Sequence, residues 1–172
     1  MSARDVAWAL AFALSPLGAP CARIEDLPPV VSASLPLEVR AILVGGRTLT
    51  PYVLVAHINP FYLQGDFNGD GKRDTAVLVK NRSSGKVGIA IFLSGKQTPV
   101  VVGAGKALGN GGDDLFWMDA WSVQSKGAAR RGVSDEAPPR LRGDALLVMA
   151  TDSASSLIYW NGSAYAWYQE GD

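Results

Sequence analysis

Side chains with oxygen atoms recur at alternate positions in residues 66–74. This segment holds Asp66, Asn68, Asp70 and Asp74, with Lys72 at a position where only a backbone carbonyl could bind a cation. Three carboxylates this close together repel one another unless a cation lies between them. Carboxylate, amide and carbonyl oxygens are the ligands of Ca²⁺, which binds about 6–8 of them at irregular angles. The spacing therefore predicts a calcium-binding loop.

The residues around these oxygens fit a tight loop that leads into a strand. Gly69 and Gly71 allow the chain to turn sharply around a point, and Gly71 directly follows Asp70. An EF-hand would need a glutamate where this chain has Val77, and a helix where residues 75–79 predict a strand. The alternative to a calcium loop is a metal-free turn, in which Asp and Asn side chains bond to their own backbone.

A calcium loop followed directly by a β-strand resembles the loops of FG-GAP and VCBS-type repeats, including the propeller blades of integrin α-chains. The resemblance covers residues 65–79 and implies a ligand set of Asp66, Asn68, Asp70, the Lys72 carbonyl and Asp74. Propellers need about 4–8 blades, whereas this sequence has one such loop. The resemblance therefore implies a single blade-type hairpin within a different β domain.

The overall layout is also similar to that of small exported bacterial proteins of unknown function. Such proteins pair this loop with a Gly-Asn-Gly-Gly-Asp-Asp stretch, here residues 109–114, and end in an aromatic hairpin, here residues 159–169. This resemblance spans most of residues 23–172 and implies no activity.

The elements that must position the loop are predicted to be mainly strands. Apolar and β-branched runs predict strands at residues 51–58, 75–80, 86–93, 99–102, 117–123, 144–149, 156–160 and 164–169. The pair Asn161-Gly162 is a strong hairpin signal because both residues tolerate positive φ. We expect one mainly β domain over residues 23–172, an α+β fold of antiparallel hairpins with one short helix.

The segments between the strands are predicted to be a helix and loops. Residues 35–44 predict the helix, with Ser34 as its cap and Pro36 in its first turn. The Pro-rich residues 23–34 predict a tether or a surface strap, while residues 103–114 and 124–143 predict loops, the second of them long and exposed.

Composition excludes some classes of function. The chain has 172 residues with 16 basic and 16 acidic side chains, so its formal charge is zero. A zero net charge argues against a nucleic-acid partner, because proteins that bind nucleic acids normally carry an excess of basic residues. The single cysteine, Cys21, excludes an internal disulfide, and one histidine leaves too few ligands for a typical zinc site.

The N-terminus predicts export. Residues 6–14 form an apolar run preceded by Arg4, and small or helix-breaking residues follow over residues 15–22. This layout is typical of a signal peptide, predicted here over residues 1–22, and it is too short for a transmembrane helix. The protein is therefore expected to be secreted or periplasmic. Two alternatives stay open: a lipid anchor on Cys21, and a buried N-terminal helix.

Two further groups of residues could do chemistry or bind a partner. Asp113 and Asp114, with Asp119 nearby, could form a second cation site or an acid–base pair, or could simply belong to a turn. Trp117 and Trp121 could stack on sugars or anchor a protein, or could lie in the core.

These observations together predict an exported, non-catalytic β module in which Ca²⁺ orders a β-hairpin. Its expected partner is an unidentified protein or glycan. One alternative is an exported hydrolase that uses Asp113, Asp114 or Asp119, although no catalytic signature stands in the sequence. Another is a purely structural protein of the cell envelope.

Overall fold

The computed structural model describes residues 27–45, 49–132 and 137–171. The predicted signal peptide, residues 1–22, lies outside them, as does Cys21. Within the described ranges, no helix has both the length and the apolar character needed to cross a membrane.

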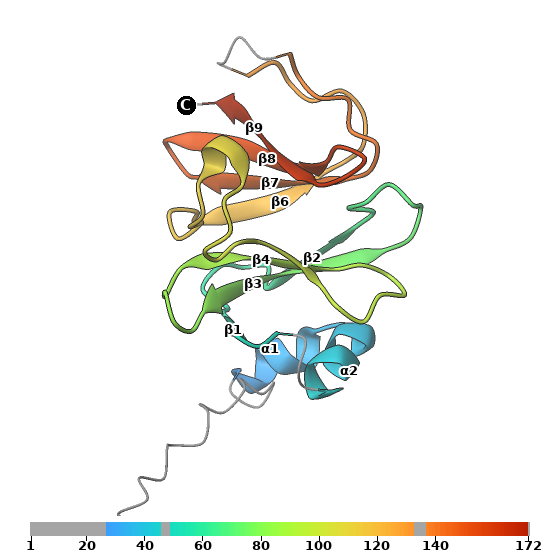
Figure 1. The fold of residues 1–172 in the computed structure, drawn as a ribbon, viewed down its shortest axis with the longest axis vertical. Helices are drawn as coiled ribbons and strands as arrows, with labels where there is room; N and C mark the ends of the chain where they lie inside the picture. The colour runs from blue at the N-terminus through green and yellow to red at the C-terminus, as the bar shows by residue number, and fades with distance from the viewer. Residues whose placement is uncertain (1–26, 46–48, 133–136, 172) are drawn as a thin grey trace, which may run out of the picture.

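The described residues form two antiparallel sheets, each made from strands that are consecutive in the chain (Figure 1). The first sheet contains β1 (Tyr52–Leu54), β2 (Tyr62–Gly65), β3 (Asp74–Asn81), β4 (Val87–Phe92) and β5 (Val100–Gly103). Its order is β1-β3-β4-β5, and β2 also pairs with β3. The second sheet has the order β6-β7-β8-β9. Its strands are β6 (Ala120–Gln124), β7 (Ala145–Ala150), β8 (Ala154–Trp160) and β9 (Tyr165–Gly171).

The two sheets pack face to face and enclose the main core (Figure 1). The first sheet contributes alternate residues of β3 and β4, namely Ala76, Leu78, Ile89 and Ile91, and the second contributes Leu146, Val148 and Ile158. Period-2 alternation places all these side chains on the facing surfaces. Phe67, from the predicted calcium loop, joins this core.

Two helices, α1 (Pro29–Ser34) and α2 (Leu37–Gly45), cover the other face of the first sheet (Figure 1). Leu35 and Val39 pack there against Val77, Val79 and Phe92. Because both of its faces are covered, β3 reads in the sequence as a continuous apolar run.

The predicted fold class is confirmed: the protein is mainly β, with antiparallel hairpins in one compact unit. The helix predicted at residues 35–44 corresponds to α2. The surface strap predicted for residues 23–34 is wrong over Pro29–Ser34, where a proline at the first turn starts α1 and Val31 is buried.

One strand prediction and one loop prediction also need correction, and one strand was missed. The strand expected at residues 51–58 is limited to Tyr52–Leu54, and β2 was not predicted at all. Residues 124–143 are not wholly exposed. Ala129 and Leu141 in that segment are buried against Ala145, Leu157 and Tyr168 on the outer face of the second sheet.

Candidate metal centre

The predicted calcium loop connects β2 to β3. Gly65 and Asp74, which flank it, are paired across the two strands, so the loop closes the hairpin. Gly69 and Gly71 have φ angles of 76° and 81°, a region that other residues adopt only at a cost. The chain from Gly69 to Arg73 is exposed, whereas Phe67 and Asp74 are buried. The loop is therefore anchored at both ends and open to solvent in the middle.

The polar side chains of the loop turn inward onto its backbone. The Asp70 N–H donates to both Asp66 Oδ1, at 2.9 Å, and Asn68 Oδ1, at 3.0 Å. Asp66 Oδ2 accepts the Gly71 N–H at 2.9 Å, and Asp70 Oδ1 accepts the Lys72 N–H at 2.8 Å. Sharing one donor brings the oxygens of Asp66 and Asn68 close together. These bonds also occur in a metal-free turn of this kind.

Asp74 is the buried member of the group, with 1% of its surface exposed. Its Oδ2 accepts the Phe67 N–H at 3.0 Å, and its Oδ1 accepts the Ser94 N–H at 2.8 Å. Burial raises the pKa of Asp74, and the charges of Asp70 and Asp66 raise it further, against the opposing effect of these two hydrogen bonds. Asp74 thus joins the two ends of the loop to the segment that follows β4.

The loop contacts Gly143 and Asp144, which directly precede β7 of the second sheet and which no sequence pattern marks as part of the site. Asp66 N–H donates to Asp144 Oδ2 at 2.9 Å, and Asp144 N–H donates to the Asp66 carbonyl at 2.7 Å. A Cβ atom on Gly143 would lie 2.3 Å from the Asp66 carbonyl oxygen and 2.6 Å from the Gly69 nitrogen. The two backbones are therefore in direct contact.

A tyrosine from β9 also lies in the electrostatic field of the loop. The Tyr165 hydroxyl is buried and has no hydrogen-bond partner among the described residues. Its pKa is raised, first by burial and then by the charges of Asp74 and Asp66. The tyrosine is 91 positions from Asp74 in the sequence (165 − 74), and no local pattern marks it as part of the site.

The donor set fits a hard cation, but the described side chains are not gathered around a single point. The hydrogen bonds described for each of Asp66, Asp70 and Asp74 use about half of a carboxylate's roughly four acceptor positions. In the part of the chain that the structure describes, no group of three or more His, Cys, Asp or Glu side chains is spaced to hold a metal ion. Binding by this loop would require its side chains to turn from the backbone towards an ion.

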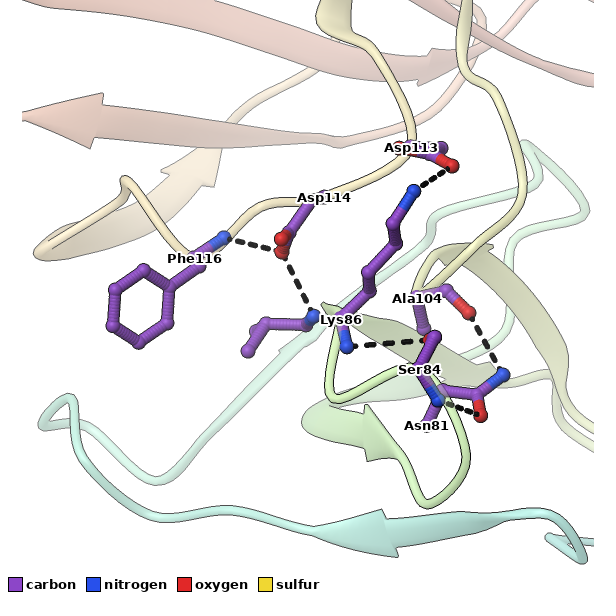
Figure 2. A network of polar contacts seen from close by, with 8 residues as sticks. Asn81, Ser84, Lys86, Ala104, Asp113, Asp114 and Phe116 are labelled. Atoms are coloured by element: carbon purple, nitrogen blue, oxygen red, sulfur yellow. Dashed lines mark hydrogen bonds and ion pairs between the residues drawn. The ribbon is translucent and has the colours of Figure 1, made fainter.

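The second acidic group serves to attach a loop to the first sheet. Asp113 forms a 2.5 Å ion pair with Lys86, and Asp114 Oδ1 accepts the N–H groups of Val87, at 2.9 Å, and Phe116, at 3.0 Å (Figure 2). Asp119 Oδ1 accepts both the hydroxyl and the N–H of Thr151, which lowers its pKa. Each carboxylate thus has a structural partner of its own.

These contacts predict unequal effects for two neighbouring substitutions. Asp114→Ala should lower the free energy of unfolding by about 1–3 kcal/mol, because it leaves the N–H of buried Val87 without its acceptor. Asp113→Ala removes only a partly exposed ion pair and should cost no more than about 1 kcal/mol. Urea denaturation of both variants measures the difference. A larger loss for Asp113→Ala would contradict this assignment.

The structure separates the two candidate tryptophans. Trp121 has 4% of its surface exposed, and its Nε1 donates to the Pro60 carbonyl at 2.8 Å, so it belongs to the core. Trp117 is 37% exposed and meets Trp167 edge to face, with ring centroids 6.0 Å apart.

Comparison with known proteins adds no assignment: no protein-family model, curated protein or solved structure matches this chain.

Proposed function

We propose that the protein is a non-catalytic β module in which the loop of residues 66–74 binds one Ca²⁺ ion. The observation that carries the proposal is the convergence of the Asp66 and Asn68 side-chain oxygens on one N–H, that of Asp70. Two acceptors held this close, at least one of them charged, are stabilised by a cation between them. The ligands are Asp66, Asn68, Asp70, the Lys72 carbonyl and Asp74.

Electrostatics supports a cation at this place. The charge of buried Asp74 is disfavoured by desolvation and by Asp66 and Asp70. A divalent cation opposes both effects on the Asp74 charge, because it attracts all three carboxylates at once and so favours their charged forms. Water molecules complete the coordination. The buried Tyr165 hydroxyl lies in the field of these charges and has no hydrogen-bond partner within the described ranges, which suits a water molecule of the hydrated site.

Calcium suits the loop better than magnesium. The middle of the loop is exposed and rich in glycine, so its oxygens are not fixed in an octahedral arrangement. Ca²⁺ accepts such irregular geometry, whereas Mg²⁺ requires near-octahedral coordination and keeps much of its water.

The role of the ion in this proposal is structural. Asp66 bonds to Asp144 through both its N–H and its carbonyl, so an ion that fixes Asp66 also fixes the contact between the two sheets. Calcium modules outside the cell bind the ion at about 10⁻⁴–10⁻³ M, which matches the expected export of this protein. Its external partner would be a protein or a glycan.

Isothermal titration of the full chain with CaCl₂ tests the binding step. We expect one ion per chain, and Asp70→Asn should weaken binding by at least about tenfold, equal to ~1.4 kcal/mol. Asp152→Asn is the matched control. Asp152 is also exposed and lies in a turn with a φ of 75°, and its substitution changes the charge by the same amount. Absence of binding by the unmodified chain, or an equal loss in both variants, would overturn the proposal.

A further inference from the structure

A cleft of about 320 Å³ lies on the second sheet, away from the calcium loop. It is formed by the turn Gly109–Gly111, the β7–β8 connection and β9, with Trp117 at one side. The polar and aromatic residues that line it are Asn110, Trp117, Ser153, Ser156, Trp167 and Gln169. In Figure 1 the segment between β5 and β6, drawn in yellow, lies across the strands of this sheet.

The aromatic wall of the cleft is held rigidly. A Cβ atom on Gly111 would lie 2.4 Å from Cε3 of Trp167, so the glycine backbone lies directly against the indole ring. The edge-to-face contact with Trp117, at an interplanar angle of 80°, holds a second side of Trp167. Trp117 itself keeps 37% of its surface exposed. Trp167 is thus held from two sides, and Trp117, which packs against it edge to face, presents a partly exposed indole beside the cleft.

The polar groups of the cleft are amides and hydroxyls. Ser156 Oγ donates to Gln169 Oε1 at 2.9 Å, and Gln169 Nε2 donates to the Gly171 carbonyl at 2.7 Å. These bonds fix the position of the Gln169 amide. None of the described residues that line the cleft carries a charge, so nothing in this part of its wall would compensate a charged ligand.

We propose that this cleft binds a neutral saccharide, with a sugar ring against Trp117 and its hydroxyls bonded by Asn110, Ser153 and Gln169. A pyranose ring has an apolar C–H face and a rim of hydroxyl groups, which matches an aromatic surface bordered by amides and hydroxyls. The cleft is at the small end of the range for ligand pockets, which suits a short part of a sugar chain. The proposal is independent of calcium, since no residue of the calcium loop lines the cleft.

Titration of the full chain with three neutral hexasaccharides, cellohexaose, maltohexaose and N-acetylchitohexaose, tests this inference through tryptophan fluorescence and calorimetry. At least one of them should bind, and Trp117→Ala should weaken that binding by at least about tenfold. Phe116→Ala is the matched control, because Phe116 is 72% exposed and adjacent in sequence but does not line the cleft. Its affinity should be unchanged.

Two further measurements make the result decisive. Melting curves of Trp117→Ala identify any loss caused by unfolding, and Trp117→Phe, which keeps an aromatic ring, should retain intermediate affinity. A hexamer of galacturonic acid serves as the anionic probe and should not bind. Failure of all three neutral probes at millimolar concentration, equal losses for Trp117→Ala and Phe116→Ala, or binding of the anionic probe alone would each overturn the inference.

Discussion

Replacing Gly143 by alanine is expected to lower the free energy of unfolding by about 3 kcal/mol. The new Cβ atom would lie 2.3 Å from the Asp66 carbonyl oxygen and 2.6 Å from the Gly69 nitrogen. Because both are backbone atoms, the movement of a flexible side chain cannot relieve the clash with the new Cβ atom. The loop would have to separate from the segment before β7 and lose its two hydrogen bonds with Asp144. At about 2–4 °C per kcal/mol for a chain of this size, the melting midpoint should fall by roughly 6–12 °C.

Gly45→Ala is the control for this substitution. Gly45 is the last residue of α2, and among the described residues outside the helix backbone and its chain neighbours, no atom would lie within 4 Å of a Cβ atom there. Its effect should stay within about 1 kcal/mol and tend to stabilise, because alanine favours the helix more than glycine does. Calorimetric melting of both variants measures the contrast. Equal midpoints for the two variants would show that the loop does not depend on close contact with Gly143.

Much of the fold could be predicted from the sequence, because local patterns specify it. The apolar runs on each side of residues 81–85 predicted the β3–β4 hairpin, and Asn161-Gly162 predicted the turn between β8 and β9. The strand β2 escaped prediction because it has only four residues, Tyr62–Gly65, too few to establish an alternating pattern. Residues 124–143 looked fully exposed because polar residues surround Ala129 and Leu141, which are buried only by tertiary packing.

The candidate site was predictable only in its local part. The spacing of Asp66, Asn68 and Asp70 appears within a few residues, and the inward turn of their side chains follows from it. Gly143 and Asp144 could not be recognised in the same way, because Asp144 lies 78 positions from Asp66 in the sequence. Asp66 follows β2 of the first sheet and Asp144 precedes β7 of the second sheet, and the two residues meet because the sheets pack against each other. The same holds for Tyr165, which looks in the sequence like any other aromatic residue of a terminal hairpin.

Calcium is expected to produce the largest gain in stability. A ligand that binds only the folded state adds about 2.7 kcal/mol when its concentration is 100 times its dissociation constant. The melting midpoint should therefore rise by roughly 5–11 °C between chelator and saturating Ca²⁺. Asp70→Asn should remove at least about half of this rise, because it replaces a charged oxygen ligand in the exposed part of the loop by a neutral amide and weakens binding at least about tenfold. Asp152→Asn, with the same change in charge, should keep the full rise.

Thermal melting of the full chain in Ca²⁺ and in chelator is the measurement that tests the central proposal most directly. Magnesium at the same concentration is a parallel arm, in which a smaller rise is expected. A calcium-specific rise that Asp70→Asn lowers by at least about half and that Asp152→Asn preserves is the result that the proposed site requires. Identical midpoints with Ca²⁺ and with chelator would contradict it, and residues 66–74 would then be a metal-free turn held by its own hydrogen bonds.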